Sequence, residues 1–454
     1  MRLVPRPPEI GPNDGFTPKN DIFGYREFGE RLGSLVAGID QPLTLLLDGP
    51  WGSGKSTFVK QWAGYMRNRG AAVVEFNAFA NDHQDDAFIV LAAEIIALAK
   101  EHLGGNESRV RKLVNSAKKA GARLLPLATR LAIRASTMGL LSVDDIEAAG
   151  ETVKEFAKEL GDEAAKAAEQ AVSDRIRNAR NDHAAMATFR QSLKDVSDAI
   201  RAKASDSGQP PFPLVFIIDE LDRCRPPFAL EIFERVKHLM SVPGVVFLFV
   251  TNLDQMAAAV RGAYGQSTNG EQYLEKFYDH RIMLPMSEIY RQSQRKKYID
   301  YLWLEIIPLQ TEPRFNQLLR EQVLSVCEKH DVPLRTTERI ITNLALILSA
   351  NGGFKLAPIV AGLASMRQIS PPLYEKARRS QLTIEDIDPF FGFSELSPQA
   401  RDTDRARNWW RYCLDPSMND ADADKYTNSM FDYSVERDEI VSRCTEKIDN
   451  FMIG

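Results

Sequence analysis

The fold is decided by the stretch Gly49-Pro50-Trp51-Gly52-Ser53-Gly54-Lys55-Ser56, which Thr57 follows. Its Gly, Lys and Ser residues have the spacing of a phosphate-binding loop, and an apolar run at residues 43–47 directly precedes it. A glycine-rich turn lets backbone N–H groups approach phosphate oxygens, and the helix that follows adds its N-terminal donors. We therefore expect residues 49–57 to bind a nucleoside triphosphate.

Two side chains of this loop have chemical roles of their own. Lys55 supplies a mobile positive charge to the β- and γ-phosphate oxygens, and Ser56 supplies a hydroxyl ligand for Mg²⁺. The amphipathic run at residues 56–69 is the helix that such a loop requires after it. The sequence thus predicts a nucleotide site that also takes Mg²⁺.

The composition is that of an ordinary globular protein. Of 454 residues, 44% are apolar and 26% charged, and the net charge of -5 argues against a protein whose main task is to wrap nucleic acid. The four cysteines lack metal-ligand spacing, and residues 1–14 lack the apolar core of a signal peptide. No apolar run approaches the roughly 20 residues needed to cross a bilayer. We expect a cytoplasmic protein.

Buried parallel strands are predicted where β-rich runs are apolar without alternation. These runs are residues 43–48, 72–76, 214–219 and 245–251, and residues 281–285 are a candidate for a fifth. Helical periodicity lies between them. The pattern predicts an α/β fold, a P-loop NTPase core in which helices flank a parallel sheet.

The second and third predicted strands are separated by far more residues than a crossover helix needs, which predicts a large helical insertion. We divide the chain into a first part of the core at 1–81, the insertion at 82–208, a second part of the core at 209–290, a C-terminal helical domain at 291–393 and a C-terminal extension at 394–454. The extension is polar but contains recurrent aromatic residues, so we expect it to dock on the body or on a partner.

Charge is segregated along the insertion. Residues 109–134 carry only basic charges, and acids dominate residues 144–169. The basic segment is either a solvated face that pairs with the acidic helix beside it or a patch for anionic lipid or nucleic acid. The sequence leaves both interpretations open.

The third predicted strand ends in two acids, Asp219 and Glu220. Beside a phosphate loop, the first carboxylate can hold Mg²⁺ and the second can deprotonate the attacking water. We assign Asp219 to the metal and Glu220 to the general base.

Thr251 and Asn252 end the next strand, where a polar side chain would position the attacking water. We assign this role to Asn252; the alternative is that Asn252 is an ordinary strand cap.

In combination, these elements resemble the KAP family of P-loop NTPases. Besides the phosphate loop, the resemblance rests on Phe76-Asn77-Ala78-Phe79, Ile218-Asp219-Glu220-Leu221-Asp222-Arg223-Cys224 and Tyr273-Leu274-Glu275-Lys276-Phe277. The family usually has Trp where Phe79 stands and often Asp where Glu220 stands. The resemblance implies an ATPase with the additional-strand, catalytic-Glu type of core, in a soluble branch that lacks the transmembrane helices of many members.

The resemblance also implies further site residues. It places Asn77, Asp222 and Arg223 near the nucleotide, although Asp222 and Arg223 would equally suit a pair that caps the helix starting near Pro226. It implies that Arg335, after Pro333 and Leu334, lies over the γ-phosphate as a sensor.

Related ring-forming ATPases complete the site with an arginine from a neighbouring subunit, which here would require a homo-oligomer. Candidates are Arg281, Arg261 and Arg225, of which we choose Arg281; the alternative is a surface ion pair. Near the N-terminus, Phe23 or Tyr25 would stack on adenine or simply pack in the core.

We therefore expect a Mg²⁺-dependent ATPase that switches or drives a protein partner encoded nearby, with the insertion and the C-terminal helices transmitting the nucleotide state. Bacterial members of the family that it resembles often act in defence against phage or mobile DNA. One alternative is a nucleotide-gated scaffold on a membrane surface or protein partner, with little turnover. A kinase is disfavoured because the sequence shows no separate pocket for a molecule that would accept the phosphoryl group.

Overall fold

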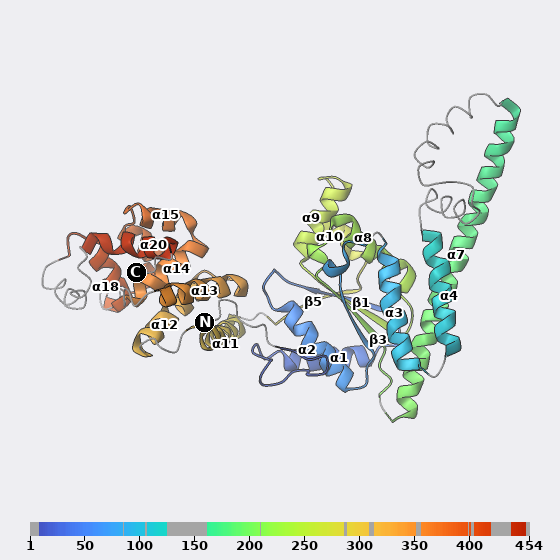
Figure 1. Ribbon diagram of the computed structural model, residues 1–454, viewed down its shortest axis with the longest axis horizontal. Helices are drawn as coiled ribbons and strands as arrows, with labels where there is room; N and C mark the ends of the chain where they lie inside the picture. The colour runs from blue at the N-terminus through green and yellow to red at the C-terminus, as the bar shows by residue number, and fades with distance from the viewer. Residues whose placement is uncertain are drawn as a thin grey trace.

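The computed structural model describes residues 9–84, 86–104, 107–124, 161–208, 210–285, 288–307, 313–350, 356–397, 399–400, 404–418 and 437–450. Three bodies follow one another along its long axis: a C-terminal group of helices, a central sheet with its covering helices, and a helical arm (Figure 1).

The central sheet has five parallel strands in the order β2-β3-β4-β1-β5. These strands are β1 (Leu43–Asp48), β2 (Val73–Asn77), β3 (Leu214–Asp219), β4 (Val245–Thr251) and β5 (His280–Met283). Strand β4 is inserted between β1, which leads into the phosphate loop, and β3, which ends in the acids. This is the additional-strand arrangement, so the predicted fold class is confirmed.

The three inner strands of the sheet, β3, β4 and β1, are buried on both faces, which explains why they read as continuous apolar runs. Every residue of β1 and β4 is buried, and in β3 only Asp219 is partly exposed. Leu45 and Leu47 pack in one apolar cluster with α1 (Arg26–Ala37) and α2 (Lys55–Asn68). Leu46 packs on the opposite face in a second cluster.

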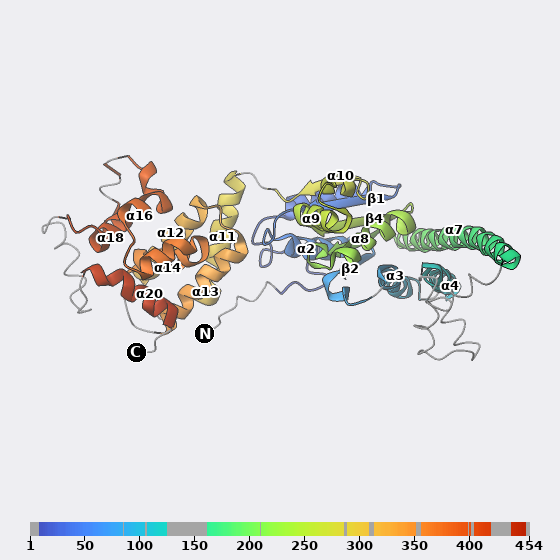
Figure 2. The ribbon, with the colours of Figure 1, turned by 90° about the horizontal axis from the view of Figure 1, so that it is seen from above.

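The second cluster is formed with helices α3 (Ala87–Leu103), α8 (Pro226–Arg235), α9 (Leu253–Tyr264) and α10 (Gly270–Glu275). Figure 2 shows α9 and α10 over the part of the core near β1 and β4. Because both faces are covered, functional groups gather at the edge where the strands end.

The helical arm consists of α4 (Glu107–Leu124) and α7 (Gly161–Asp206), which lie side by side and continue outward from α3 (Figures 1 and 2). Near the C-terminal end of α7, the Ser197 hydroxyl donates to the carbonyl of Gly244 at 2.6 Å, and Arg201 pairs with Asp40 at 3.0 Å. Gly244 and Asp40 precede β4 and β1, so the arm is anchored where these strands begin. Most of the predicted acidic segment, and the basic segment beyond residue 124, lie outside the described residues.

The C-terminal body is helical. Its helices are α11 (Glu288–Ile306), α12 (Pro313–Lys329), α13 (Leu334–Ala350), α14 (Ala357–Ile369), α15 (Pro371–Arg378), α16 (Ile384–Phe391), α18 (Arg405–Leu414) and α20 (Ile440–Asn450). Helix α14 is its centre, buried from Ala357 to Met366. Trp409 and Trp410 of α18 are buried in the same apolar cluster. In the part of the chain that the structure describes, no helix has the length and apolarity needed to cross a membrane.

Candidate functional site

The loop between β1 and α2 has a backbone that favours glycine. Gly52 and Gly54 have φ angles of 78° and 86°, in the left-handed region where a side chain is strained. Lys55 begins α2, and the first N–H groups of a helix have no partner within it. The loop and the helix end together form a cradle for an anion.

Lys55 lies inside this cradle and is only 8% exposed. Its Nζ donates to the carbonyl oxygens of Gly49 at 2.5 Å and of Pro50 at 3.0 Å. Burial lowers the pKa of Lys55, while the nearby carboxylates of Asp222, Asp219 and Asp48 act in the opposite direction. The ammonium group is therefore placed to exchange loop carbonyls for phosphate oxygens.

A second polar group of the loop is buried. The Ser53 hydroxyl is buried and has no hydrogen-bond partner within the described residues. Buried polar atoms are normally paired, and an exception points to a missing ligand or water. The loop thus fits a bound phosphate chain.

A hydroxyl and a carboxylate meet at the end of β3. The Ser56 hydroxyl donates to the carboxylate of Asp219, and the Glu220 N–H donates to the same carboxylate at 2.7 Å. Burial raises the pKa of Asp219, and these two hydrogen bonds oppose the rise. A hydroxyl beside a carboxylate is a donor set that suits Mg²⁺, with phosphate oxygens and waters as the other ligands.

The described residues contain no group of three or more His, Cys, Asp or Glu side chains that would hold a metal ion alone. Mg²⁺ bound chiefly by protein carboxylates is therefore not indicated there. The Ser56 and Asp219 pair fits a metal that enters together with a nucleotide.

Glu220 has both carboxylate oxygens engaged. Oε2 accepts from Nδ2 of Asn77 at 3.0 Å, and Oε1 pairs with Nη1 of Arg223 at 2.7 Å. The Glu220 backbone has a φ of 64° and a ψ of 29°, left-handed values that cost a non-glycine residue about 1 kcal/mol. Strain of this kind concentrates at functional positions.

Asp222 joins the phosphate loop to the end of β4. Its Oδ2 accepts from Nε1 of Trp51 at 2.7 Å and from the backbone N–H of Asn252 at 3.0 Å. The alternative in which Asp222 and Arg223 pair and cap α8 is not observed, because Arg223 pairs with Glu220 and α8 has no side-chain cap. Both residues instead belong to the surroundings of the loop.

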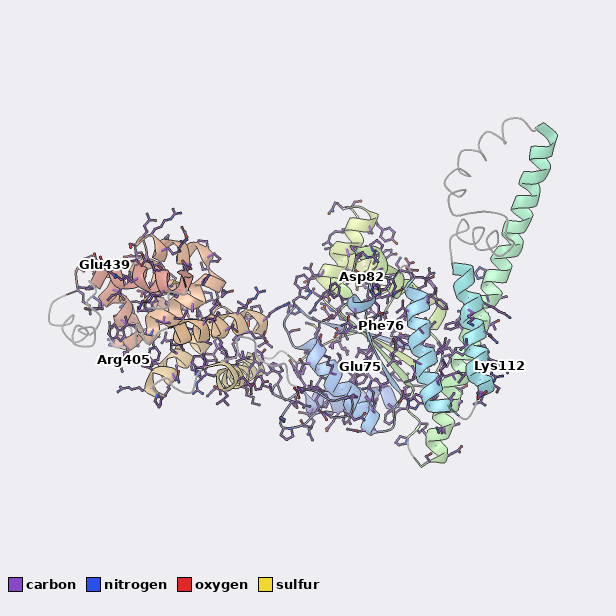
Figure 3. All side chains as sticks on the ribbon, in the orientation of Figure 1. Glu75, Phe76, Asp82, Lys112, Arg405 and Glu439 are labelled. Carbon is purple, nitrogen blue, oxygen red and sulfur yellow. The ribbon has the colours of Figure 1, made fainter. Side chains whose placement is uncertain are left out.

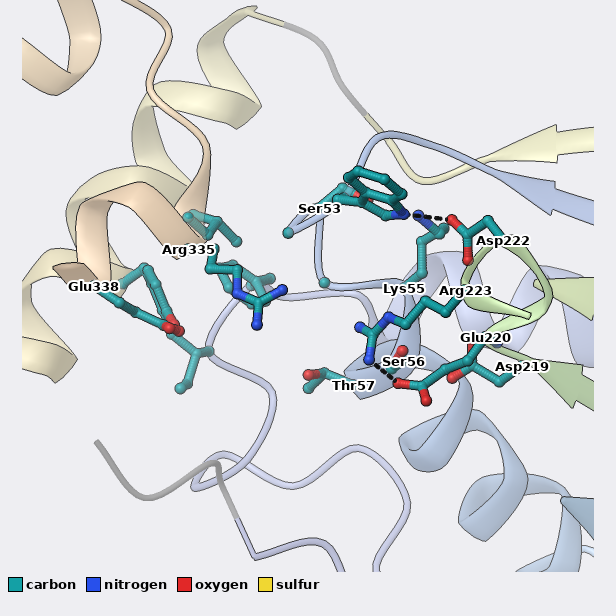
Figure 4. Close-up of a pocket in the computed structure, with 17 residues that line it drawn as sticks. Ser53, Lys55, Ser56, Thr57, Asp219, Glu220, Asp222, Arg223, Arg335 and Glu338 are labelled. Carbon is teal, nitrogen blue, oxygen red and sulfur yellow. Dashed lines mark hydrogen bonds and ion pairs between the residues drawn. The ribbon is translucent and has the colours of Figure 1, made fainter. Parts of the chain in front are cut away.

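These groups line a cleft of about 260 Å³ between the core and the C-terminal body (Figure 4). The core contributes Trp51, Gly52, Ser53, Gly54, Lys55, Ser56, Thr57, Asp219, Glu220, Asp222 and Arg223. The other lining residues are Ile22, Phe23, Tyr298, Leu334, Arg335 and Glu338. Figure 4 shows Arg335 pointing from α13 into the cleft, and its side chain bonds none of the described residues.

The sequence pattern of the KAP family P-loop domain matches residues 25–351. The chain belongs to the KAP family. The match runs from the start of α1, through the phosphate loop, the arm and the acids of β3, to the end of α13, so every wall of the cleft except Ile22 and Phe23 lies within the KAP domain.

No curated protein matches this KAP chain. Among solved structures, the ORC2 protein of Aeropyrum pernix, in ADPNP and ADP complexes, is similar over 98% of this chain and 97% of its own. The identity is 12% and the TM-score 0.37, a likeness too weak to carry an argument about the KAP site.

An apolar end of the KAP cleft is formed around Phe23. Its ring lies 5.3 Å from that of Tyr298 between centroids, and Leu334 completes the wall. Tyr25 lies beneath the cleft, 1% exposed, with its ring edge-on to Phe58 at 5.7 Å. Of the two aromatic residues predicted for adenine, Phe23 reaches the cleft and Tyr25 packs in the core.

Asn252 does not line the cleft of this KAP chain. Its Oδ1 accepts from the backbone N–H groups of Asp254 at 3.1 Å and Gln255 at 3.4 Å and so caps α9. Asn252 therefore has the capping role that was the alternative to positioning water. The neighbouring Thr251 hydroxyl is fully buried without a hydrogen-bond partner among the residues described.

Arg281 also lies outside the KAP cleft. Its Nε donates to Asp48 at 3.0 Å, and the other oxygen of this buried carboxylate accepts from the Leu253 N–H at 2.8 Å. Arg225 is similarly bonded to Asp82 at 3.2 Å. The structure thus gives Arg281 the ion pair named as its alternative.

Sequence reasoning missed Tyr298 and Glu338 of the KAP cleft. The Tyr298 hydroxyl donates to the Glu338 carboxylate, and both side chains face the cleft from helices α11 and α13. An aromatic residue at helical spacing reads as a core residue, so no local signal distinguished Tyr298.

Proposed function

We propose that this KAP chain is a Mg²⁺-dependent ATPase. The proposal is carried by one observation: a single cleft gathers the phosphate loop, the Asp219 and Glu220 acids, and Arg335 from a separate helical body. Lys55 and the loop amides would bind the phosphates, and Ser56 and Asp219 would hold Mg²⁺. When bound, Mg²⁺ neutralises developing charge on the phosphate oxygens.

Glu220 is the residue proposed to activate water. Its carboxylate would take one proton as the water oxygen attacks the γ-phosphorus and the bond to the ADP oxygen breaks. Each carboxylate oxygen keeps a second lone pair that can accept this proton. In this structure Oε2 is bonded to Asn77 and Oε1 to Arg223, and release of one of these bonds would let the carboxylate turn toward the attacking water.

The energy of hydrolysis is proposed to move the C-terminal body relative to the core. A ligand shifts a conformational equilibrium by its different affinity for the two states. ATP in this cleft would contact the core through Lys55 and the helical body through Arg335, and loss of the γ-phosphate would remove the shared contact. A protein partner bound to the helices would sense this change.

The biological setting carried over from the family resemblance is defence against phage or mobile DNA. Its test is plating efficiency of phage on cells that express either the wild type or Lys55→Ala. Protection that needs Lys55 supports the setting, and equal plating on both contradicts it.

A nucleotide-gated scaffold on a membrane surface is the second candidate, because α4 exposes basic residues. These are Arg109, Arg111, Lys112, Lys118 and Lys119. Lys112 lies on the side of the arm that faces away from the sheet (Figure 3). Asp195 and Asp198 of α7, however, share a groove with Arg109 and Lys112 and offset part of this charge. We therefore rank the scaffold second.

The ATPase proposal is tested by phosphate release and ATP binding in Lys55→Ala. The variant should lose ATP binding by about 100-fold or more, because it removes the buried ammonium group that lies within the loop against the carbonyls of Gly49 and Pro50. Lys60→Ala is the matched control, since Lys60 is an exposed residue of the same helix outside the cleft. Normal ATP binding and turnover by Lys55→Ala would contradict the proposal.

A further inference from the structure

Arg223 is a cation within the cleft whose base is rigidly held. It ends the short helix η2 (Leu221–Arg223), in which Leu221 is fully buried and Asp222 is bonded to the loop and to β4. The Arg223 side chain itself is 44% exposed. The guanidinium group therefore has freedom that its backbone lacks.

Arg223 lines the same cleft as Lys55 of the phosphate loop and Arg335 of α13. Figure 4 shows Arg223 and Arg335 pointing toward one another across the cleft. Like charges that converge on a shared space favour an anion between them, and the guanidinium fork matches phosphate geometry.

We propose that Arg223 binds the γ-phosphate of ATP from within the same chain, and that it leaves Glu220 to do so. The proposal rests on the ATPase function proposed above. In this structure, Arg223 engages Oε1 of Glu220 at 2.7 Å. The γ-phosphate carries more negative charge than one carboxylate and would take the guanidinium, which would release Oε1 and let the Glu220 carboxylate turn toward the attacking water. ADP has no γ-phosphate and leaves the pair closed.

With this assignment, Arg223 supplies from within the chain the positive charge that ring-forming ATPases obtain from an arginine of a neighbouring subunit. Arginines supplied within the chain are known to serve phosphoryl transfer in other P-loop proteins. Arg281 and Arg225 are held by Asp48 and Asp82 at positions outside the cleft. Hydrolysis per chain should therefore not rise with protein concentration.

The test is a double-mutant cycle on nucleotide affinity, with calorimetric titration of AMP-PNP and of ADP, each with Mg²⁺. Arg223→Gln should weaken AMP-PNP by about 10- to 100-fold, the range for a lost charged hydrogen bond, and leave ADP within about twofold. Glu220→Gln should tighten AMP-PNP, since no ion pair has to open. In the double variant, Glu220→Gln with Arg223→Gln, this gain in AMP-PNP affinity should disappear, because Arg223 is absent.

Arg235→Gln is the matched control. Arg235 makes a local pair with Glu231 at 2.6 Å on α8, outside the cleft, so its loss should leave both affinities unchanged. Arg223→Lys, which keeps the charge without the fork, should retain part of the AMP-PNP affinity and serves if Arg223→Gln misfolds.

The proposal is overturned if the Arg223 variants weaken AMP-PNP and ADP equally or not at all, or if the gain from Glu220→Gln persists without Arg223. Failure of the ATPase proposal is distinguished by the behaviour of wild type. In that case wild type binds neither nucleotide, or binds both and releases no phosphate.

Discussion

A Cβ atom built on Gly52 of the phosphate loop would lie 3.3 Å from the Cβ of Arg335 at the start of α13. The loop and the C-terminal body are therefore in direct contact. Gln294 of α11 adds a contact between the body and the segment before α1, a hydrogen bond of 3.1 Å to the carbonyl of Phe23. A change of the loop on nucleotide binding would reach the helices without an intermediary.

Gly52→Ala should impair both the loop and this contact. Gly52 has a φ of 78°, which costs alanine about 1 kcal/mol, and the new methyl group presses on Arg335. We expect weaker ATP binding by about tenfold, measured by calorimetry. The matched control is Gly262→Ala in helix α9, where the methyl group meets nothing within 4 Å and alanine should stabilise the helix. Unchanged ATP affinity in Gly52→Ala would contradict the tight contact.

Arg335→Gln should slow ATP turnover by about 10- to 100-fold without lowering the melting temperature. The side chain enters the cleft and bonds no described residue, so its loss removes a ligand contact and no structural one. Arg339, exposed on the same helix and outside the cleft, provides the control variant Arg339→Gln. If both variants turn over ATP alike, Arg335 does not contact the nucleotide.

The strands were predictable because the signal is local. Apolar runs placed all five strands to within about two residues, and the loop and the acids Asp219 and Glu220 followed from their position at strand ends. Strand β2 extends to Asn77, one residue beyond the predicted run, which places Asn77 opposite Asp219 in register and brings its carboxamide to Glu220.

The side-chain partners were less predictable. A residue that ends a strand and one that caps the next helix look alike in sequence, which is why Asn252 was assigned to water. Arg281 pairs with Asp48, a residue 233 positions away, and Tyr298 meets Glu338 between two helices. Such pairs depend on how elements pack, and no local pattern encodes them.

Asn252 can be tested by separating its cap from any contact with water. Asn252→Ala should lose about 1 kcal/mol of folding stability because α9 loses its cap, whereas Asn252→Ser keeps a capping oxygen and should keep stability. We expect Asn252→Ser to keep ATP turnover as well, measured by phosphate release. A stable Asn252→Ser protein with turnover reduced about 100-fold would restore the role of positioning water.

The basic face of α4 should not bind membranes strongly, because acids of α7 share its groove. Flotation with vesicles of phosphatidylcholine and phosphatidylserine should leave wild type in the soluble fraction. Asp195→Asn with Asp198→Asn removes the compensating charge and should increase any binding. Strong flotation of wild type that vanishes when Arg109, Lys112 and Lys118 are changed to Gln would favour the scaffold.

The role of Glu220 as general base is tested most directly by the rate of phosphate release from Mg²⁺-ATP by Glu220→Gln, with ATP binding measured on the same sample. We expect the variant to bind ATP and to release phosphate about 10² to 10⁴ times more slowly than wild type, because a carboxamide cannot take the proton of water. Glu231→Gln, which alters an ion-paired acid on α8, should release phosphate normally. Release by Glu220→Gln at the wild-type rate would show that Glu220 is not the general base.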